Sequence, residues 1–224
     1  MITEKLERLY PALRIIAERL GPVKALWLVG GSTGLLMHGV PLAADPRDLD
    51  LYADRESVPA LHGALRSYAT DVPHFSETGM YVSNLSHYRI DGVKVELVGG
   101  FEVRRDVSLY RVETAQIMAP HSLEFLIPHE ADPIRIQVMP LAHELLFNVL
   151  RERPDRYEPI AAHMRHNLPA YLDAWTALVR RNRIAEPFLG IVRGLLPEWA
   201  EERSRRENAK PLGMEKQGEG DAPP

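Results

Sequence analysis

Apolar residues follow helical spacing near the N-terminus and strand spacing soon after it. Between residues 3 and 20, apolar side chains recur along one stripe of a helix, and a Gly-Pro pair ends that helix. The next apolar run, residues 25–29, is short and continuous and leads into Gly30-Gly31, a pattern that predicts a buried strand. Ser32 then stands where its hydroxyl can cap a following helix.

Acidic and apolar residues alternate between residues 48 and 52, and this alternation predicts a half-buried strand. Asp91-Gly92 separates two apolar runs and predicts a two-residue hairpin turn. After residue 140 the apolar spacing becomes that of helices. The remaining predictions are a polar loop at about 71–78, hairpin strands at 86–90 and 93–98, a turn at Gly99-Gly100, strands near 109–112, 124–127 and 134–139, and helices at 57–68 and at about 140–152, 155–166, 169–182 and 187–202.

These elements predict an α+β protein, in which a mixed sheet with flanking helices precedes a helical C-terminal part. We expect an αβ domain at residues 1–139 and a helical region at residues 140–203. Residues 204–224 mix charged residues with Gly and Pro and end in Ala-Pro-Pro, which predicts a disordered tail.

Composition narrows the class of protein. The net charge of -4 argues against a generally basic surface for nucleic acid, while a local basic patch stays open. The absence of cysteine excludes disulfides, thiolate metal sites and cysteine nucleophiles. The N-terminus is too charged for a signal peptide, and no apolar run approaches the roughly 18 residues that a membrane span needs. We therefore expect a soluble, cytoplasmic protein with no membrane partner.

Three acidic residues are the candidates for chemistry. Asp48 and Asp50 are two apart on one predicted strand, so both carboxylates project from the same face. Two carboxylates this close repel each other unless a cation lies between them, and hard oxygen ligands suit Mg²⁺ or Mn²⁺. Glu96 interrupts the apolar residues of the second hairpin strand.

Each of these features also has a purely structural interpretation. A Gly-Gly-Ser turn between a strand and a helix is more often a device for tight packing than a ligand site. The two aspartates can simply form the solvent face of a strand, although strands disfavour Asp. Glu96 can be an exposed residue paired with Lys94 on the same face. Only the combination of the three features favours a catalytic site.

The order of these features resembles the minimal nucleotidyltransferases of the DNA polymerase β superfamily, near the abortive-infection toxin nucleotidyltransferases. The pattern of that family is a hydrophobic strand, Gly-Gly or Gly-Ser, a helix, an Asp-x-Asp strand and a later strand with one more acid. The matching segments are residues 26–32, 48–51 and 95–97, and the resemblance covers roughly residues 20–100. Two departures are a longer gap between Ser32 and Asp48 and the use of Glu96 where Asp is commoner.

The resemblance implies a polymerase β-like fold and a metal-dependent nucleotidyltransferase, which moves NMP from an NTP to a hydroxyl acceptor and releases pyrophosphate. Two Mg²⁺ or Mn²⁺ ions would bind to the three acids, and Glu96 could also act as the general base. The implied contacts to the nucleotide, ATP or another NTP, are Gly30, Gly31, Ser32, Arg47 and Lys94.

Several alternatives stay open at this stage. The acceptor can be a small molecule, RNA or protein, and the oligomeric state is not defined. The chain can instead be a catalytically inactive nucleotide-binding or interaction protein, including a component of a toxin–antitoxin pair. His143-Glu144 begins like a zinc-peptidase helix, but Phe147 stands where the second histidine is required, so we set that motif aside.

Overall fold

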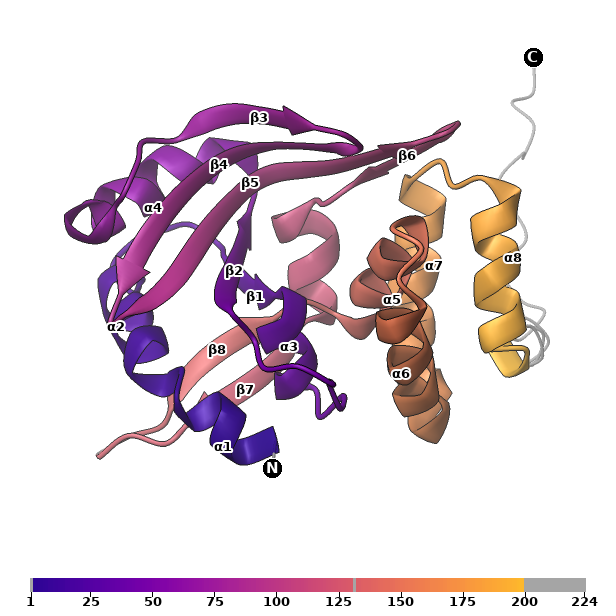
Figure 1. The fold of residues 1–224 in the computed structure, drawn as a ribbon, viewed down its shortest axis with the longest axis horizontal. Coiled ribbons are helices and arrows are strands. Elements are labelled where there is room, and N and C mark those ends of the chain that lie inside the picture. Colours follow the sequence, from indigo (N-terminus) through magenta and orange to yellow (C-terminus); the bar gives the residue numbers. More distant parts are fainter. Residues whose placement is uncertain (1, 131, 200–224) are drawn as a thin grey trace, which may run out of the picture.

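The structure is a computed structural model that describes residues 2–130 and 132–199. Its centre is a mixed sheet with strand order β3-β4-β5-β2-β1-β8-β7, and β6 pairs with the far end of β5 (Figure 1). The strands are β1 (Leu28–Gly30), β2 (Asp48–Ala53), β3 (His74–Thr78), β4 (Tyr81–Ile90), β5 (Val93–Arg105), β6 (Ser108–Arg111), β7 (Leu123–Ile127) and β8 (Ile134–Val138).

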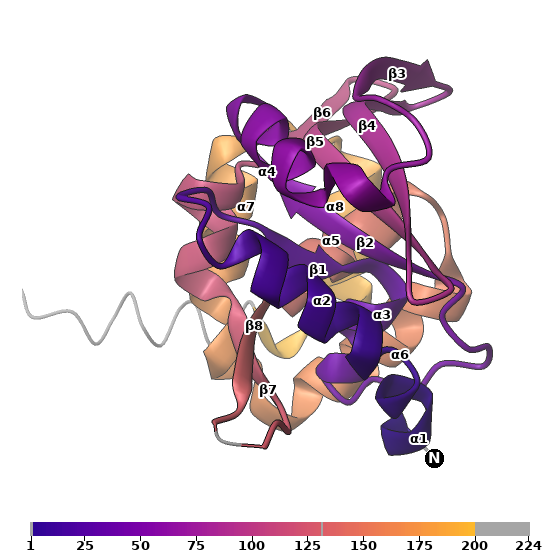
Figure 2. The ribbon, with the colours of Figure 1, turned by 90° about the vertical axis from the view of Figure 1, so that its left-hand side faces the viewer.

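Helices cover both faces of this sheet. Figure 2 looks onto the face that carries α2 and α4, with the C-terminal helices behind the sheet. The α-helices are α1 (Ile2–Glu7), α2 (Tyr10–Leu20), α3 (Gly31–Met37), α4 (Val58–Leu65), α5 (Leu141–Leu150), α6 (Pro154–Met164), α7 (Leu172–Arg181) and α8 (Glu186–Leu195). The expected α+β class, with a mixed sheet and flanking helices, is confirmed.

The alternation along β2 divides its side chains between the two faces. Leu49 and Leu51 belong to the buried cluster that also contains residues of α2 and α4. Tyr52 belongs to a second cluster, which contains residues of α5 to α8. Because side chains alternate along a strand, Asp48 and Asp50 lie on the same face as Tyr52, toward the C-terminal helices.

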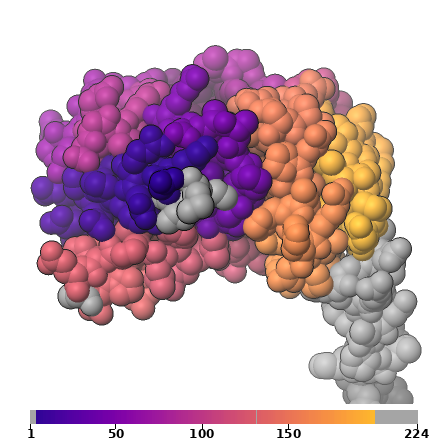
Figure 3. All heavy atoms as spheres, turned by 60° about the horizontal axis from the view of Figure 1, so that its bottom comes forward, coloured from indigo at the N-terminus to yellow at the C-terminus, as the bar shows by residue number. Residues whose placement is uncertain are grey.

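The C-terminal helices pack directly against this second face. All ten residues of α5 are buried, and Leu145 and Leu146 share a cluster with Leu28 of β1. Figure 3 shows the helical part, in orange and yellow, lying against the sheet part. The division of the chain between residues 139 and 140, into an αβ domain and a helical region, stays a prediction. The predicted tail at 204–224 lies outside the described residues.

Several boundaries differ from those predicted. The helix expected at residues 3–20 is broken between α1 and α2, because Pro11 in the first turn of α2 has no N–H to donate to the preceding turn. Strand β3 replaces most of the loop expected at 71–78 and pairs along its whole length with β4. The strand expected at 25–29 is limited to β1, and α8 ends at Leu195 rather than near residue 202.

Gly99-Gly100 forms no turn, which corrects the prediction. Both glycines lie inside β5, which continues to Arg105. A Cβ atom at Gly99 would collide with the Val58 side chain at the start of α4, so glycine there permits close packing of helix on strand. No helix among the described residues is long and apolar enough to cross a membrane.

Candidate active site

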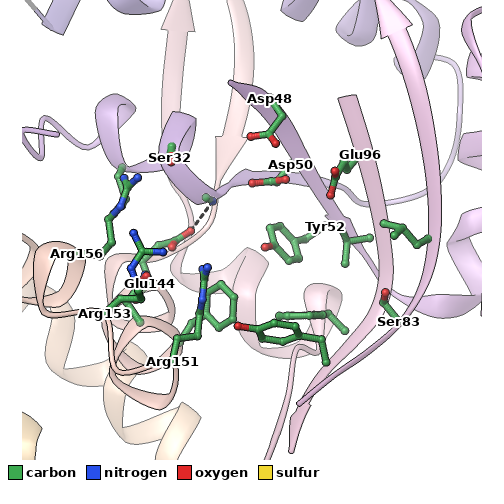
Figure 4. Close-up of a pocket in the computed structure, with 18 of the residues that line it drawn as sticks. Ser32, Asp48, Asp50, Tyr52, Ser83, Glu96, Glu144, Arg151, Arg153 and Arg156 are labelled. Atoms are coloured by element: carbon green, nitrogen blue, oxygen red, sulfur yellow. Dashed lines mark hydrogen bonds between the residues drawn. The ribbon is translucent and has the colours of Figure 1, made fainter. Parts of the chain in front are cut away.

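A cavity of about 440 Å³ lies between the second face of the sheet and the α5–α6 segment (Figure 4). Its walls come from α3, β2, β3, β4, β5 and α5 together with the residues that follow α5. The polar residues that line it are Ser32, Asp48, Asp50, Ser76, Thr78, Ser83, Glu96, Glu144, Asn148, Arg151, Arg153 and Arg156. The cavity therefore brings carboxylates, hydroxyls and guanidinium groups together.

Asp48, Asp50 and Glu96 form what we call the acidic wall. Strands β2 and β5 are parallel neighbours, and their register places Asp50 directly beside Glu96. All three side chains line the same cavity, and Figure 4 shows them side by side on the two strands. The structure thus brings together the three acids that the sequence singled out.

Asp50 is the most electrostatically strained member of the acidic wall. Burial, together with the nearby charges of Asp48, Glu96 and Glu144, raises the pKa of its carboxyl group to about 8, while Arg151 opposes this rise. At neutral pH this carboxyl group therefore favours the protonated form. A bound cation would relieve the same repulsion.

The donor set of the acidic wall fits a hard divalent cation, because it consists of carboxylate oxygens. Within residues 2–130 and 132–199, no three side chains of His, Cys, Asp or Glu are arranged as a group that could hold a metal ion. The side chain of Lys94 bonds to the carboxylate of Glu96 instead. The observation that favours a cation is the crowding around Asp50.

The Gly30-Gly31-Ser32 corner lies next to Asp50, as predicted. Gly31 has a φ of +60°, and a Cβ atom there would collide with Oδ2 of Asp50, so only glycine permits this approach. Ser32 and Gly31 line the cavity, whereas Gly30 does not. A Cβ atom at Gly30 would lie 2.6 Å from Cε2 of Tyr52, which indicates that Gly30 serves packing.

Glu144 of α5 is a site residue that the sequence analysis missed. Its side chain is buried, and its Oε1 accepts a hydrogen bond of 2.8 Å from the backbone N–H of Gly31. Its Oε2 is buried without a hydrogen-bond partner, and burial raises the pKa of the carboxyl group to about 7. The sequence held one indication of this role, because Glu144 is a carboxylate among the apolar residues at 141–150. We considered Glu144 there only as part of a zinc motif.

The two basic residues expected near the nucleotide do not line the cavity. Arg47 is exposed and lies outside it. Lys94 is half-exposed and is paired with Glu96, and it too is absent from the lining. The simple pairing of Lys94 with Glu96, considered as the alternative from sequence, is therefore what the structure shows.

Three arginines that the sequence analysis did not select form what we call the arginine wall, Arg151, Arg153 and Arg156. Arg151 stacks over the ring of Phe147, with its Cζ 4.7 Å from the ring centroid. Arg153 makes two hydrogen bonds of 2.8 and 2.7 Å to Asp155. In sequence these residues belong to the charged stretch 151–156, where one predicted helix ends and the next begins, and such a stretch is usually a solvated surface.

The solved structures that resemble this chain include the following three. A "putative nucleotidyltransferase" from Thermotoga maritima superposes with a TM-score of 0.55 at 22% sequence identity, over 72% of this chain and 95% of the other. The antibiotic-resistance factor ANT(2'')-Ia in solution gives a TM-score of 0.41 at 9% identity, over 93% and 99%. The complex of ANT(2'')-Ia with adenylyl-2''-tobramycin gives 0.39 at 16% identity, over 91% and 99%.

Only the first of these TM-scores exceeds 0.5, so the Thermotoga maritima structure alone establishes a shared fold. The chain has a nucleotidyltransferase fold with a mixed sheet and flanking helices, consistent with the polymerase β-like resemblance of its sequence. No protein-family model and no curated protein sequence matches the chain. Because a fold can carry unrelated activities, the function has to be argued from the site.

Proposed function

We propose that this protein is a metal-dependent nucleotidyltransferase that transfers NMP from an NTP to a hydroxyl acceptor and releases pyrophosphate. The observation that carries the proposal is the meeting of Asp48, Asp50 and Glu96 in one cavity beside the Gly31-Ser32 corner. Each feature alone has a structural explanation. Together, however, these carboxyl groups are crowded in a buried position, where the pKa of Asp50 rises to about 8 and the folded protein loses stability. A cation-binding role would explain why the protein keeps such an unfavourable cluster.

The proposed reaction forms one bond and breaks one bond at the α-phosphorus. The acceptor oxygen attacks that phosphorus, the bond from it to the bridging oxygen of the β-phosphate breaks, and pyrophosphate leaves. Glu96 accepts the proton of the acceptor hydroxyl. Mg²⁺ or Mn²⁺ on the three acids, two ions in our proposal, would neutralise phosphate charge and lower the pKa of the acceptor hydroxyl.

The apolar part of the cavity offers room for the remainder of the nucleotide or the acceptor. Tyr81 and Phe101 stack with their ring centroids 5.9 Å apart, and Phe147 packs edge-on against Phe101 at 5.4 Å. Tyr52 lies next to the acidic wall in Figure 4, and its ring packs edge-on against Phe101 with the centroids 5.7 Å apart. Such aromatic surfaces exclude water from the reacting groups and orient a planar base or a sugar ring.

A transfer assay tests the proposal. The purified chain is incubated with Mg²⁺ or Mn²⁺ and each of the four NTPs labelled at the α-phosphate, with cell RNA, protein or a small-molecule extract as the acceptor. We expect label to pass from at least one NTP to one acceptor class, with stoichiometric release of pyrophosphate.

Two variants make this assay specific. Asp48→Asn removes one carboxylate of the acidic wall and should abolish the transfer, whereas Asp132→Asn changes an exposed aspartate outside the cavity and should leave it unchanged. Binding of NTP without transfer to any acceptor would support the alternative of a nucleotide-binding protein without catalysis. Equal transfer by wild type and Asp48→Asn would show that the acids are not the catalytic site.

A further inference from the structure

We infer that the arginine wall, mainly through Arg151 and Arg156, holds the β- and γ-phosphates of the nucleotide, in place of the Gly31-Ser32 corner that the family resemblance suggests. This inference rests on the proposed function, because it assigns one end of the proposed substrate to one wall of the same cavity.

The first observation concerns the corner. The backbone N–H of Gly31, which would have to donate to a phosphate oxygen there, already donates to Oε1 of Glu144 at 2.8 Å. The carboxyl group of Glu144 is buried beside it, and its ionised form would repel a phosphate group at short range. Asp50 also lies against Gly31, so the corner faces two acidic side chains. A polyanion is therefore poorly accommodated at this position.

The second observation concerns the other two predicted phosphate contacts. Arg47 is exposed outside the cavity, and Lys94 is bonded to the carboxylate of Glu96. Neither residue presents a free positive charge to the cavity. The cationic partners of a triphosphate must then come from elsewhere in the lining.

The arginine wall supplies those partners. Arg151 has no carboxylate within ion-pair distance among the described residues, and its guanidinium group is held by the rings of Phe147 and Tyr81. Nη1 of Arg156 is buried and donates to no partner among the described residues, although Nε of the same residue lies 3.6 Å from Oδ2 of Asp155. Burial lowers the pKa of Arg156, and the charges of Arg153 and Arg151 lower it further. Within the described part of the chain, Arg151 therefore has no ion-pair partner, and Nη1 of Arg156 keeps an unused donor.

The two walls complement the two ends of one ligand. A nucleoside triphosphate with bound divalent cations presents those cations to carboxylates and its terminal phosphate oxygens to guanidinium groups, which bind phosphate through charge-assisted hydrogen bonds. Figure 4 shows the arginine wall across the cavity from the acidic wall. The α-phosphate would then lie by the acidic wall, with the leaving pyrophosphate directed toward α5 and α6.

Calorimetric titration of the full chain with inorganic triphosphate and Mg²⁺ tests this assignment without requiring catalysis. We expect the wild type to bind, and Arg151→Gln and Arg156→Gln each to bind about ten- to a hundredfold more weakly, as expected for the loss of one charged hydrogen-bonding partner. Raising the salt concentration should weaken wild-type binding more than binding by either variant.

Three variants control for other effects. Arg180→Gln removes an exposed positive charge from α7 outside the cavity and should bind as the wild type does. Arg47→Gln should also bind normally, which separates the arginine wall from the position expected from sequence. Arg151→Lys keeps the charge and should retain more affinity than Arg151→Gln, and thermal unfolding of every variant verifies that the fold is intact.

The outcomes separate this inference from the proposed function. Unchanged triphosphate affinity in folded Arg151→Gln and Arg156→Gln overturns the inference, as does a wild type that binds no triphosphate. Loss of binding in Arg47→Gln instead would favour the phosphate position that the family resemblance implies. If the arginine variants lose binding while the wild type transfers no label in any assay, the inference stands and the proposed function fails.

Discussion

The two walls of the cavity position their charges by different physical means. On the acidic wall, the carboxylates leave adjacent parallel strands, and the backbone ladder of β2 and β5 fixes their spacing. On the arginine wall, long side chains leave the end of α5 and the start of α6 and are held by aromatic rings and by Asp155. The first arrangement is rigid and suits a reacting centre. The second can adapt and suits the flexible end of a ligand.

The largest effect should come from removing the central carboxylate of the rigid wall. Asp50→Asn should reduce transfer by more than about a hundredfold, since even partners that only support metal ligands are worth about 10–100-fold. The same substitution should stabilise the cation-free protein at pH 7 by on the order of 1–4 kcal/mol, because folding no longer has to protonate a carboxyl group whose pKa is raised to about 8. Kinetic assays and denaturant unfolding measure the two effects. Full activity would place the reacting centre elsewhere.

The corner beside the acidic wall gives the next largest effect. Gly31→Ala combines a left-handed backbone, which costs a side chain about 1–2 kcal/mol, with a collision against Asp50. Gly79→Ala is the matched control, because Gly79 has a φ of +58° and open space around it. Chemical denaturation should show the greater loss of stability for Gly31→Ala. Equal losses would mean that the contact with Asp50 imposes no constraint.

The crowding of carboxylates predicts an unusual dependence of stability on pH. The folded-state pKa values of Asp50, about 8, and Glu144, about 7, both exceed their ordinary values. The folded protein therefore binds more protons than the unfolded chain between about pH 5 and pH 8, and stability falls as pH rises through that range. Without divalent cations, we expect a loss of about 1–3 kcal/mol in wild type over this range and a smaller loss in Asp50→Asn. Thermal unfolding at several pH values measures it, and a flat profile for both proteins would contradict the crowding.

The smallest effect should come from the ion pair at the margin of the acidic wall. Lys94 is half-exposed, and exposed ion pairs contribute about 0–1 kcal/mol. Lys94→Gln should change the free energy of unfolding by less than about 1 kcal/mol and leave transfer within a few-fold of wild type. A large loss of transfer would instead support the role of Lys94 as a contact to the nucleotide, which the sequence suggested.

The same contrast explains how much of the site could be predicted from sequence. Asp48 and Asp50 were predictable because strand geometry is local, so two residues of separation place two side chains on one face. Glu96 followed from a hairpin with a clear turn signal at Asp91-Gly92. The mixed sheet and the helical C-terminal part followed from periodicity, since both depend on short-range patterns.

The arginine wall and Glu144 could not be predicted, because their roles depend on contacts between distant segments. Glu144 accepts a hydrogen bond from Gly31, which is 113 residues away in the sequence, and no local sequence pattern predicts that contact. Local patterns also failed where tertiary packing decides the backbone. Gly99 looks like a turn residue until the position of Val58 is known, and β3 becomes a strand through its pairing with β4.

The position of β2 in the sheet has a practical consequence. β2 and its partner β5 occupy the middle of the strand order, with β3 at one border and β7 at the other. Peptide tags or reporter proteins joined at the β7–β8 connection would be separated from the reacting centre by two intervening strands, β8 and β1. That border of the protein is the natural place to attach probes for imaging, immobilisation or partner capture while leaving the chemistry undisturbed.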